Sequence, residues 1–413
     1  EEKRSSMQTE LAPEFQGTPE GQEAEAILRK CVHCGFCTAT CPTYQLFGDE
    51  LDGPRGRIYL IKQVLEGQAP TEKTQLHLDR CLTCRNCEST CPSGVQYGHL
   101  VDIGRKIVDE RVPRSAGSRA LRWALKEGLS SPLFGPAMKI GQSVRGLLPQ
   151  ALKKKVPAPQ PAGAWPARSH ARKVLMLAGC VQPSMAPNIN SATARVLDPA
   201  GIEVVIAKNA GCCGAVKFHL NDQDGGRAQM RANIDAWWPY VERGEVEALV
   251  MNASGCGVTV KEYGHLLKDD AAYADKARRI SELTRDLSEL LPQLVPALQG
   301  RVRPPEGVLA YHPPCTLQHG QQLRGGVEHH LSALGFEVRV APIESHLCCG
   351  SAGTYSVLQP DTAEQLRDRK LGHLGTLQPS AIVSANIGCI THLQSGTGTP
   401  VRHWVEVLDA ALG

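Results

Sequence analysis

The sequence predicts an α + α/β chain, in which an N-terminal helical domain is followed by two repeated parallel α/β domains. Three observations lead to this fold class. One four-cysteine spacing occurs twice near the N-terminus, among segments of helical periodicity. Beyond residue 170, short apolar runs alternate with helical segments. The cysteines of this second part then recur at a nearly constant interval, which indicates an internal repeat.

Length and composition narrow the class of protein. The 413 residues favour two or three domains, and 45 basic against 42 acidic residues give no basic footprint for nucleic acid. We find neither a run of apolar residues long enough to span a membrane nor a secretory signal at the polar N-terminus. We therefore expect the sixteen cysteines to lie in a reducing cytosol and to bind metal.

The two cysteine runs share the pattern C-x2-C-x2-C-x3-C-P. The first is "CVHCGFCTATCP" and the second, fifty residues later, is "CLTCRNCESTCP". Three closely spaced thiolates can bind three irons of one cubane, and the fourth cysteine of such a run usually ligates the other cluster. This predicts two [4Fe–4S] clusters with crossed ligation. One would use Cys31, Cys34, Cys37 and Cys91, and the other Cys81, Cys84, Cys87 and Cys41.

Zinc and disulfides are the alternatives for these eight cysteines. Zinc sites usually show two C-x2-C pairs rather than a triplet with a fourth cysteine and proline. Disulfide frameworks belong to small secreted domains. The spacing therefore favours iron–sulfur clusters.

Helical periodicity surrounds both runs. The segments "EAEAILRK", "GRIYLIKQVLEG", "TQLHLDR" and "YGHLVDIGRKIVDERV" repeat apolar residues at intervals of three and four. We expect an α-helical two-cluster domain of ferredoxin type over residues 20–110, preceded by a flexible N-terminus at 1–19.

Residues 111–170 form a separate, basic segment. Its first part, "SRALRWALKEGLSSPLFGPAMKIGQSVRGLLP", is apolar and basic and suits either a membrane surface or a packed interface. We favour packing on the domain or on the rest of a complex, since most amphipathic helices face a core. Residues 151–170, rich in Pro, Ala and Lys, read as a linker.

The remaining chain shows the alternation of strands and helices that is typical of a parallel α/β sheet. Apolar, β-branched runs alternate with helical segments, and the same order occurs twice, in domains predicted at 171–300 and 301–413 and related by pseudo-two-fold symmetry. The expected strands are 174–179, 202–207 and 248–253, then 308–313, 336–341 and 382–386.

The other eight cysteines follow these strands. Cys315 lies 135 residues after Cys180, Cys348 136 after Cys212, and Cys389 133 after Cys256. Ligands gather at the carboxyl ends of parallel strands, so each repeat can bring four sulfurs together. The predicted metal sites are Cys180, Cys212, Cys213 and Cys256 in the first repeat, and Cys315, Cys348, Cys349 and Cys389 in the second. The alternative is buried, inert cysteine, which the paired Cys-Cys-Gly at matching offsets disfavours.

These motifs together resemble a known family. Two ferredoxin-type runs before two Cys…Cys-Cys-Gly…Cys repeats resemble the iron–sulfur subunits of flavin-linked 2-hydroxy-acid and glycerol-3-phosphate dehydrogenases. The repeat resembles the cysteine-rich CCG domain, which heterodisulfide reductases also contain. The segments "NIDAWWP", "ASGCG", "SHLCCGSAGTY" and "ANIGCITHL" resemble most closely the bacterial glycolate-oxidising members.

The resemblance implies a complex. An FAD-containing glycolate oxidase subunit would oxidise the substrate, a second flavin-domain-like subunit would accompany it, and this chain would pass the electrons to a membrane quinone. It implies a location at the cytoplasmic face, peripheral to the inner membrane. No G-x-G-x-x-G opens a helix after a strand, so we expect no FAD and no catalytic residue on this chain.

One departure from the family concerns the end of each repeat. The fullest CCG pattern closes with C-x-x-C, whereas here Cys256 is followed by "GVT" and Cys389 by "ITH". Four cysteines still suffice for a [4Fe–4S] cluster or for zinc, and His392 could replace the missing thiolate. Four more histidines near these loops are candidate proton donors or ordinary loop residues: His219, His312, His319 and His346.

Three functions remain open at this point. The chain could be an electron-transfer subunit for glycolate, or for D-lactate or glycerol 3-phosphate. It could be a disulfide or quinone reductase with chemistry at the CCG site. It could be a zinc-stabilised scaffold of such a complex. We expect at least one iron–sulfur cluster beyond the first two, because gathered thiolates repel each other unless a cation joins them.

Overall fold

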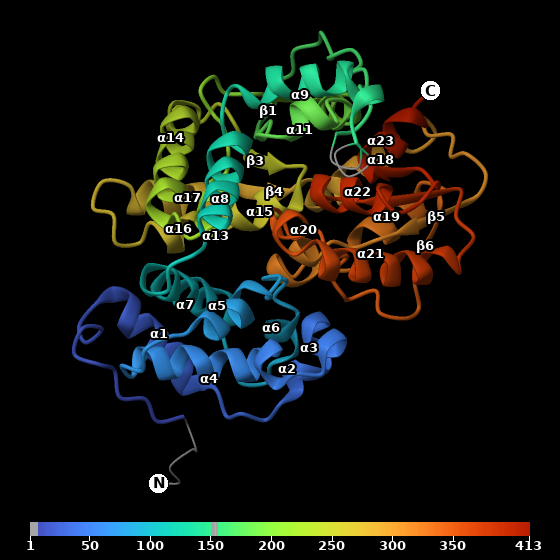
Figure 1. The fold of residues 1–413 in the computed structure, drawn as a ribbon. Helices are drawn as coiled ribbons and strands as arrows, with labels where there is room; N and C mark the ends of the chain where they lie inside the picture. Colours follow the sequence, from blue (N-terminus) through green and yellow to red (C-terminus); the bar gives the residue numbers. More distant parts are fainter. Residues whose placement is uncertain (1–6, 150–152, 154–155) are drawn as a thin grey trace. The chain divides into compact units, whose positions relative to one another are not determined.

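The structure is a computed structural model that describes residues 7–149, 153 and 156–413 (Figure 1). Residues 1–6 of the predicted flexible N-terminus and five residues of the basic segment, 150–152 and 154–155, lie outside the described residues. The chain forms two compact units. The first holds the residues up to Leu121 together with His346–Leu366, and the second holds Arg122–Ser345 and Arg367–Gly413.

The first unit is helical around both cysteine runs, as the periodicity predicts. Thr18 caps the first helix through its side chain, and Pro19 begins it. Apolar side chains from the longer helices form one buried core, which includes Leu28, Ile61 and Leu100. The helices are α1 (Pro19–Lys30), α2 (Phe36–Ala39), α3 (Pro42–Phe47), α4 (Pro54–Leu65), α5 (Glu72–Asp79), α6 (Asn86–Thr90) and α7 (Tyr97–Arg111).

The residues before α1 contact this core. Met7, Leu11 and Phe15 pack against it although they form no helix. The backbone N–H of Ala12 donates a hydrogen bond to the carbonyl of Leu65 at 2.8 Å. The described part of the N-terminal segment is therefore held by apolar contacts and by backbone bonding.

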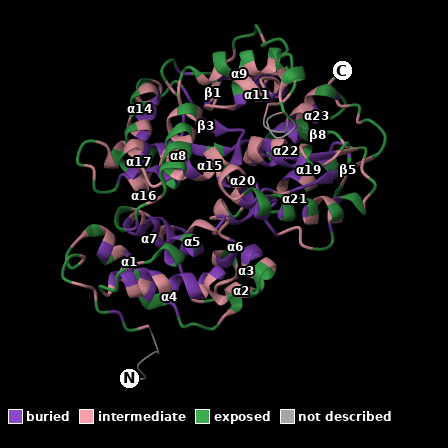
Figure 2. Cartoon of the chain, in the orientation of Figure 1, coloured by how far each residue is buried: buried purple, intermediate pink, exposed green. Residues whose placement is uncertain are grey.

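Two further helices occupy the basic segment, namely α8 (Ala116–Leu129) and α9 (Phe134–Ser143). Neither contains a buried residue, as the pink and green ribbon of α9 in Figure 2 shows. Both helices nevertheless contact the first repeat, since Gln142 of α9 donates to the carbonyl of Ser184 at 3.1 Å and Lys126 of α8 pairs with Asp222 at 3.0 Å. These contacts agree with the favoured packing on the domain, although no residue of either helix is buried. Within the described part of the chain, no helix combines the length and the apolar character that a bilayer crossing needs.

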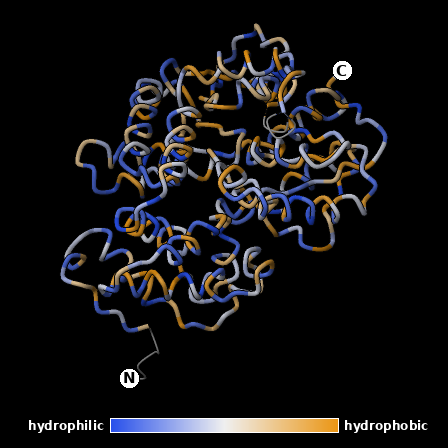
Figure 3. The backbone as a smooth tube through the Cα atoms, in the orientation of Figure 1, coloured by the Kyte–Doolittle hydropathy of each residue, from blue (hydrophilic) through white to orange (hydrophobic). Residues whose placement is uncertain are grey.

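The second unit contains two four-stranded parallel sheets. Figure 3 colours the backbone by hydropathy and shows hydrophobic segments in the interior of the chain's folded parts. The first sheet has the order β2-β1-β3-β4 and the second the order β6-β5-β7-β8, so the repeat in the sequence becomes a repeat of topology. This confirms the predicted α + α/β class. The strands are β1 (Arg172–Met176), β2 (Ile202–Val205), β3 (Ala248–Met251), β4 (Thr284–Asp286), β5 (Val308–Tyr311), β6 (Glu337–Val340), β7 (Ala381–Ser384) and β8 (Val401–His403).

Helices cover both sheets. Those of the first repeat include α12 (Asn188–Leu197), α14 (Gln223–Glu242), α15 (Ser254–Lys261) and α17 (Ala274–Leu283), and those of the second α19 (Gly326–Ala333), α21 (Pro360–Gly375), α22 (Ile387–Gln394) and α23 (Trp404–Ala410). Trp237 and Trp404 are completely buried beneath them. Each central strand is therefore apolar on both faces, as parallel strands usually are.

The ends of β3 and β7 meet within the second unit. The N–H of Ser254 donates to the carbonyl of Ala385 at 3.0 Å, and the N–H of Gly255 donates to Asn386 Oδ1 at 3.2 Å. These bonds join the loops that lead to Cys256 and Cys389. Equivalent ends of the two repeats therefore lie together.

Candidate metal centres

Both ferredoxin-type runs adopt the same backbone. Residues two and four positions after the first cysteine have positive φ angles, 53° at His33 and 83° at Gly35, then 53° at Thr83 and 58° at Arg85. Only one of these four is glycine, and left-handed backbone strains the others. The tight loop is thus held in place by the surrounding fold, and it turns three thiols of each run to one side.

The eight thiols line two cavities, and each cavity contains cysteines from both runs. One cavity is lined by Cys31, Cys34, Cys37 and Cys91, and also by Cys87. A second cavity is lined by Cys41, Cys81, Cys84 and Cys87. The fourth cysteine of each run therefore lies with the first three of the other.

These thiols are buried close to one another. Burial, and then the nearby Cys31 and Cys34, raises the pKa of Cys37 to about 11. Burial also raises the pKa of Cys87 well above its ordinary value, with Cys84 and Cys81 adding to the effect. A set of thiolates in such a place requires a cation, which an iron–sulfur cluster supplies.

Two buried arginines distinguish the second cavity. Burial opposes ionisation of Cys81, but Arg57 and Arg105 nevertheless hold the pKa of this thiol below its usual value. Arg57 is 1% exposed and donates to the carbonyl of His77 at 2.7 Å. It also pairs with the completely buried Asp52, at 3.4 Å. Nothing in the spacing of these residues marks them as functional in the sequence.

The four cysteines of the first repeat come together in the second unit. Cys180 follows β1, the Cys212–Cys213 pair follows β2, and Cys256 lies in α15. Hydrogen bonds link Cys180 to Cys212, Cys212 to Cys213 and Cys213 to Cys256. The neighbouring thiols stabilise Cys212 as a thiolate and lower its pKa to about 3, whereas those of Cys180 and Cys213 are raised. Thiolates gathered this closely repel one another unless a cation joins them.

Glycine after each Cys-Cys pair is required by its conformation. Gly214 has a φ of 95° and Gly350 of 91°. A Cβ at Gly214 would lie 2.7 Å from the carbonyl oxygen of Gly226, and one at Gly350 would lie 2.5 Å from that of Ala363. The Cys-Cys-Gly loop is therefore in close contact with α14 in the first repeat and with α21 in the second.

The second repeat distributes its cysteines differently. Cys315 and Cys389 belong to the second compact unit, whereas Cys348 and Cys349 lie on the His346–Leu366 segment of the first. All four are buried.

That segment is tied to the second ferredoxin-type run. The hydroxyl of Tyr355 donates to the carbonyl of Arg80 at 2.9 Å, next to Cys81. Asn86 donates to the carbonyl of His346 at 3.3 Å and to that of Thr40 at 3.0 Å. Both side chains are buried, so the loop with Cys348 and Cys349 is fixed beside one cluster site. The "SHLCCGSAGTY" segment contains Tyr355, but the sequence does not reveal this contact.

The candidate histidines have different surroundings. His312 is completely buried next to β5, and its ring nitrogen and the thiol of Cys389 lie within 4.8 Å of each other. His319 is buried and lies 3.4 Å from a guanidinium nitrogen of Arg324. His392, a candidate substitute ligand, is buried in α22. Among the contacts that the structure describes, His312 lies near the thiol of a candidate cysteine ligand, Cys389.

Family models match both halves of the chain. The family described as "4Fe-4S dicluster domain" matches residues 27–95, and the "Cysteine-rich domain" family matches residues 174–261 and 309–394. The first match contains the two ferredoxin-type runs, and the second contains the other eight cysteines. These matches indicate iron–sulfur clusters in the chain, as the cysteine spacing predicts.

Curated relatives extend the similarity over nearly the whole length. The glycolate oxidase iron-sulfur subunit of Escherichia coli (strain K12) is 56% identical over 411 residues, which cover 98% of this chain and 99% of the relative. A probable glycolate oxidase iron-sulfur subunit of Bacillus subtilis (strain 168) is 30% identical over 402 residues, or 90% of this chain and 89% of the relative. Lactate utilization protein A of Bacillus licheniformis is 26% identical over 247 residues, 58% of this chain and 99% of the relative. The chain therefore belongs to the family of glycolate oxidase iron–sulfur subunits, an oxidoreductase family.

Proposed function

We propose that this chain is the electron-transfer subunit of a glycolate-oxidising complex. An FAD-containing subunit would oxidise glycolate to glyoxylate, a second flavin-domain-like subunit would accompany it, and this chain would carry the electrons to a quinone. The observation that carries the proposal is the near full-length similarity to the Escherichia coli subunit, in a chain that retains sixteen cysteines at cluster spacings. The protein part of such a site ligates, orients and tunes its clusters.

The test is reconstitution with the partner subunits. The complex should reduce a quinone analogue with glycolate, and the isolated chain should not. The shorter lactate-utilisation relatives support D-lactate as the second candidate, so D-lactate and glycerol 3-phosphate are the comparison substrates. Faster turnover with either would move the proposal to that substrate.

The ferredoxin-type clusters are proposed to have crossed ligands. Cys31, Cys34, Cys37 and Cys91 would hold one, and Cys41, Cys81, Cys84 and Cys87 the other. The two cavities support this grouping, because each is lined by three thiols of one run and the fourth of the other. Each cluster would thus join the two runs and stabilise the unit around them.

A further cluster is proposed at the cysteine-rich repeats. The linked thiols Cys180, Cys212, Cys213 and Cys256 support a site in the first repeat. Iron analysis of anaerobically purified chain tests it. About eight irons per chain correspond to the ferredoxin-type pair alone, and about twelve or more to an additional cluster. Eight irons with bound zinc would make the repeats structural.

Electrons are proposed to leave the ferredoxin-type domain through the His346–Leu366 segment. Tyr355 supports this route. Burial raises its pKa most, and the nearby thiols of Cys81 and Cys348 raise it further, so both cysteines lie close to this side chain. This contact supports a cysteine-rich loop close to the proposed second cluster. The route would then run from the flavin subunit to the ferredoxin-type clusters and on to the repeats.

The quinone acceptor implies a peripheral membrane contact, and we propose α9 and the turn after it as the contact surface. Exposed apolar residues recur there at helical spacing, next to a half-buried side of the helix with Phe134 and Met138. An exposed apolar stripe of this kind needs a cover. The exposed stripe is Leu133, Ala137, Ile140, Val144 and Leu147.

Charge favours anionic lipid as this cover. Between Glu127 and Asp198 the sequence has no acidic residue, whereas basic residues follow the apolar stripe closely. Apolar burial combined with basic charge is the pattern of helices that lie in an anionic lipid surface. These basic residues are Lys139, Arg145, Lys153, Lys154 and Lys155.

Vesicle sedimentation tests this surface with a matched control. Ile140 is 66% exposed and Ile343, outside the stripe, is 58% exposed. Ile140→Glu should weaken binding to phosphatidylglycerol-containing vesicles by about tenfold, since one buried apolar side chain is lost, whereas Ile343→Glu should not. Equal loss in both variants, or a wild type that binds only the partner subunits, would contradict the lipid assignment.

A further inference from the structure

His312 is a buried side chain that the fold does not use. It directly follows β5 and is 1% exposed. Neither Nδ1 nor Nε2 has a hydrogen-bond partner in the part of the chain that the structure describes. Buried polar groups are almost always paired, because an unpaired one loses its bonds to water without replacement. The imidazole therefore needs a partner other than these protein atoms.

Its backbone, in contrast, is fully bonded. The N–H of His312 donates to the carbonyl of Val383 at 2.8 Å, and its carbonyl accepts from the hydroxyl of Ser384 at 2.9 Å. Both partners belong to β7, the neighbouring strand. The hydrogen bonds to β7 thus fix the backbone of His312, and they limit the positions that its ring can occupy.

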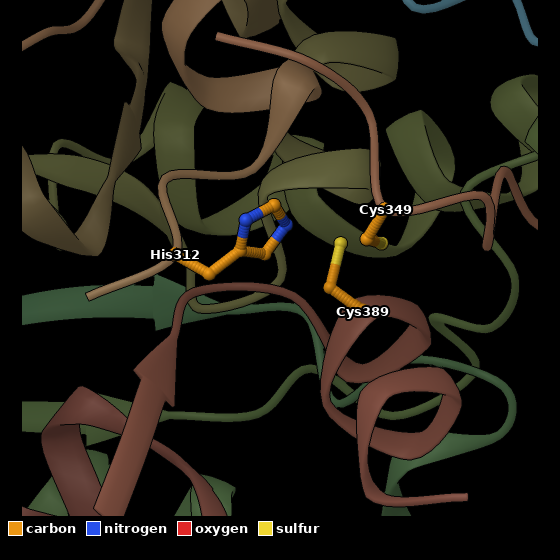
Figure 4. A group of neighbouring side chains, drawn as sticks. All are labelled: His312, Cys349 and Cys389. Carbon is orange, nitrogen blue, oxygen red and sulfur yellow. The ribbon is translucent and has the colours of Figure 1, made fainter. Parts of the chain in front are cut away.

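The ring is turned toward a cysteine of the second repeat. A nitrogen of His312 and the sulfur of Cys389 lie within 4.8 Å, and Figure 4 shows the two side chains facing one another. Cys389 lies in α22 and is 4% exposed. Cys349, the third labelled residue, belongs to the other compact unit. Neutral imidazole nitrogen is a common metal ligand.

The first repeat has no equivalent of this histidine. Cys315 lies 135 residues after Cys180, and the same offset relates His312 to Leu177, a buried apolar residue. The two sites thus differ in chemistry although their cysteines correspond. Of these two equivalent positions, only the one in the second repeat has a side chain with a nitrogen donor atom.

We propose that His312 is a nitrogen ligand of the iron centre that Cys389 helps to hold in the second repeat. Replacing thiolate by histidine raises the reduction potential of an iron–sulfur centre, because a neutral ligand stabilises the oxidised state less. The second-repeat centre then lies at a higher potential than one with cysteine ligands alone. It becomes the electron exit of the chain, from which the acceptor is reduced. This deepens the proposed electron-transfer function and rests on it.

Pulsed EPR of the reduced, cluster-loaded chain tests the ligand. Protein grown with 15N-histidine should show a strong histidine-nitrogen coupling to one centre. His312→Leu, which installs the residue of the first repeat, should abolish this coupling. His403→Gln is the control, because His403 is equally buried but both of its ring nitrogens are bonded, one to Asn252 and one to Val405. It should leave the coupling unchanged.

Labelling of the wild type keeps the test decisive if His312→Leu fails to fold. A centre with about twelve or more irons per chain but no histidine coupling overturns the assignment of His312 alone. About eight irons per chain overturns the proposed extra cluster as well, so the two failures can be told apart. His312→Cys, with a thiolate at the same position, should retain the centre and lower its midpoint potential. An unchanged potential in that variant overturns the proposal too.

Discussion

Tyr355 provides a direct test of how the second Cys-Cys-Gly loop is held. Tyr355→Phe removes the hydroxyl that donates to the carbonyl of Arg80 at 2.9 Å and leaves the ring in place. The hydroxyl is part-buried, so we expect the typical net value of one hydrogen bond, about 1 kcal/mol. With RT of about 0.59 kcal/mol, this makes local opening of the His346–Leu366 segment about fivefold more frequent.

Asn86 makes a second hydrogen bond to the same segment, so the single variants can be compared with the double variant. Asn86→Ala removes the bond to the carbonyl of His346 at 3.3 Å, and with it a bond to the carbonyl of Thr40 at 3.0 Å that does not involve the His346–Leu366 segment. If the two bonds act independently, the double variant loses about 2 kcal/mol, or about a 30-fold change in opening. A smaller combined effect would show that the loop opens as one unit once either bond is lost.

Hydrogen exchange of backbone amides measures this opening by segment. Peptides that cover His346–Leu366 should exchange about fivefold faster in Tyr355→Phe, with the rest of the chain unchanged. Tyr273→Phe is the matched control, since its hydroxyl also makes one hydrogen bond, of 2.8 Å to Asp235, outside this segment. Unaltered exchange in the segment, or an equal change in the control, would refute the tether.

Three further predictions follow from the cluster sites and the buried charges. Arg57→Met removes a buried cation beside Cys81, so redox titration should find the midpoint potential of one ferredoxin-type cluster lowered, by about 40 mV for each ~1 kcal/mol of charge interaction lost, while the exposed Arg29→Met leaves it unchanged. Cys91→Ala should abolish the EPR signal of the cluster held by Cys31 and spare the other, and loss of the other cluster instead would contradict crossed ligation. Burial lowers the pKa of His403 to about 3, below the ordinary value of about 6.5. As the pH falls below about 6.5, the unfolded chain therefore takes up a proton at this residue before the folded chain does. The free energy of unfolding should decrease by about 2 kcal/mol at pH 5. Urea unfolding of His403→Gln should show a smaller loss between pH 7 and pH 5, and an equal loss would exclude this origin.

The sequence determined the features that depend on short spacing. The periodicity around the cysteine runs predicted α1, α4, α5 and α7 correctly, because an amphipathic helix repeats its pattern every turn. The six apolar runs predicted six of the eight strands. The constant offset between the repeats predicted that the two sheets would share one topology. The motifs also identified the family.

Two strands and one surface escaped this reasoning. The strands β4 and β8 have three residues each, "TRD" and "VRH", which are too short and too polar to show a period. They are strands because a neighbouring strand pairs with them, at Leu249–Met251 and Ile382–Ser384. The apolar residues of α9 suggested burial, but the fold leaves that side of the helix exposed.

The chemical surroundings of the cysteines were decided by tertiary structure alone. The sequence named every cysteine, but not the buried Arg57 beside Cys81, the bond from Tyr355 to Arg80, or the unpaired ring of His312 near Cys389. Ligand spacing within a loop is local, so a few residues encode it. The buried arginine, the tyrosine hydrogen bond and the histidine come from segments that meet the cysteines only when the chain folds. Their distances from the cysteines in the sequence follow no regular spacing, so the sequence pattern does not reveal them.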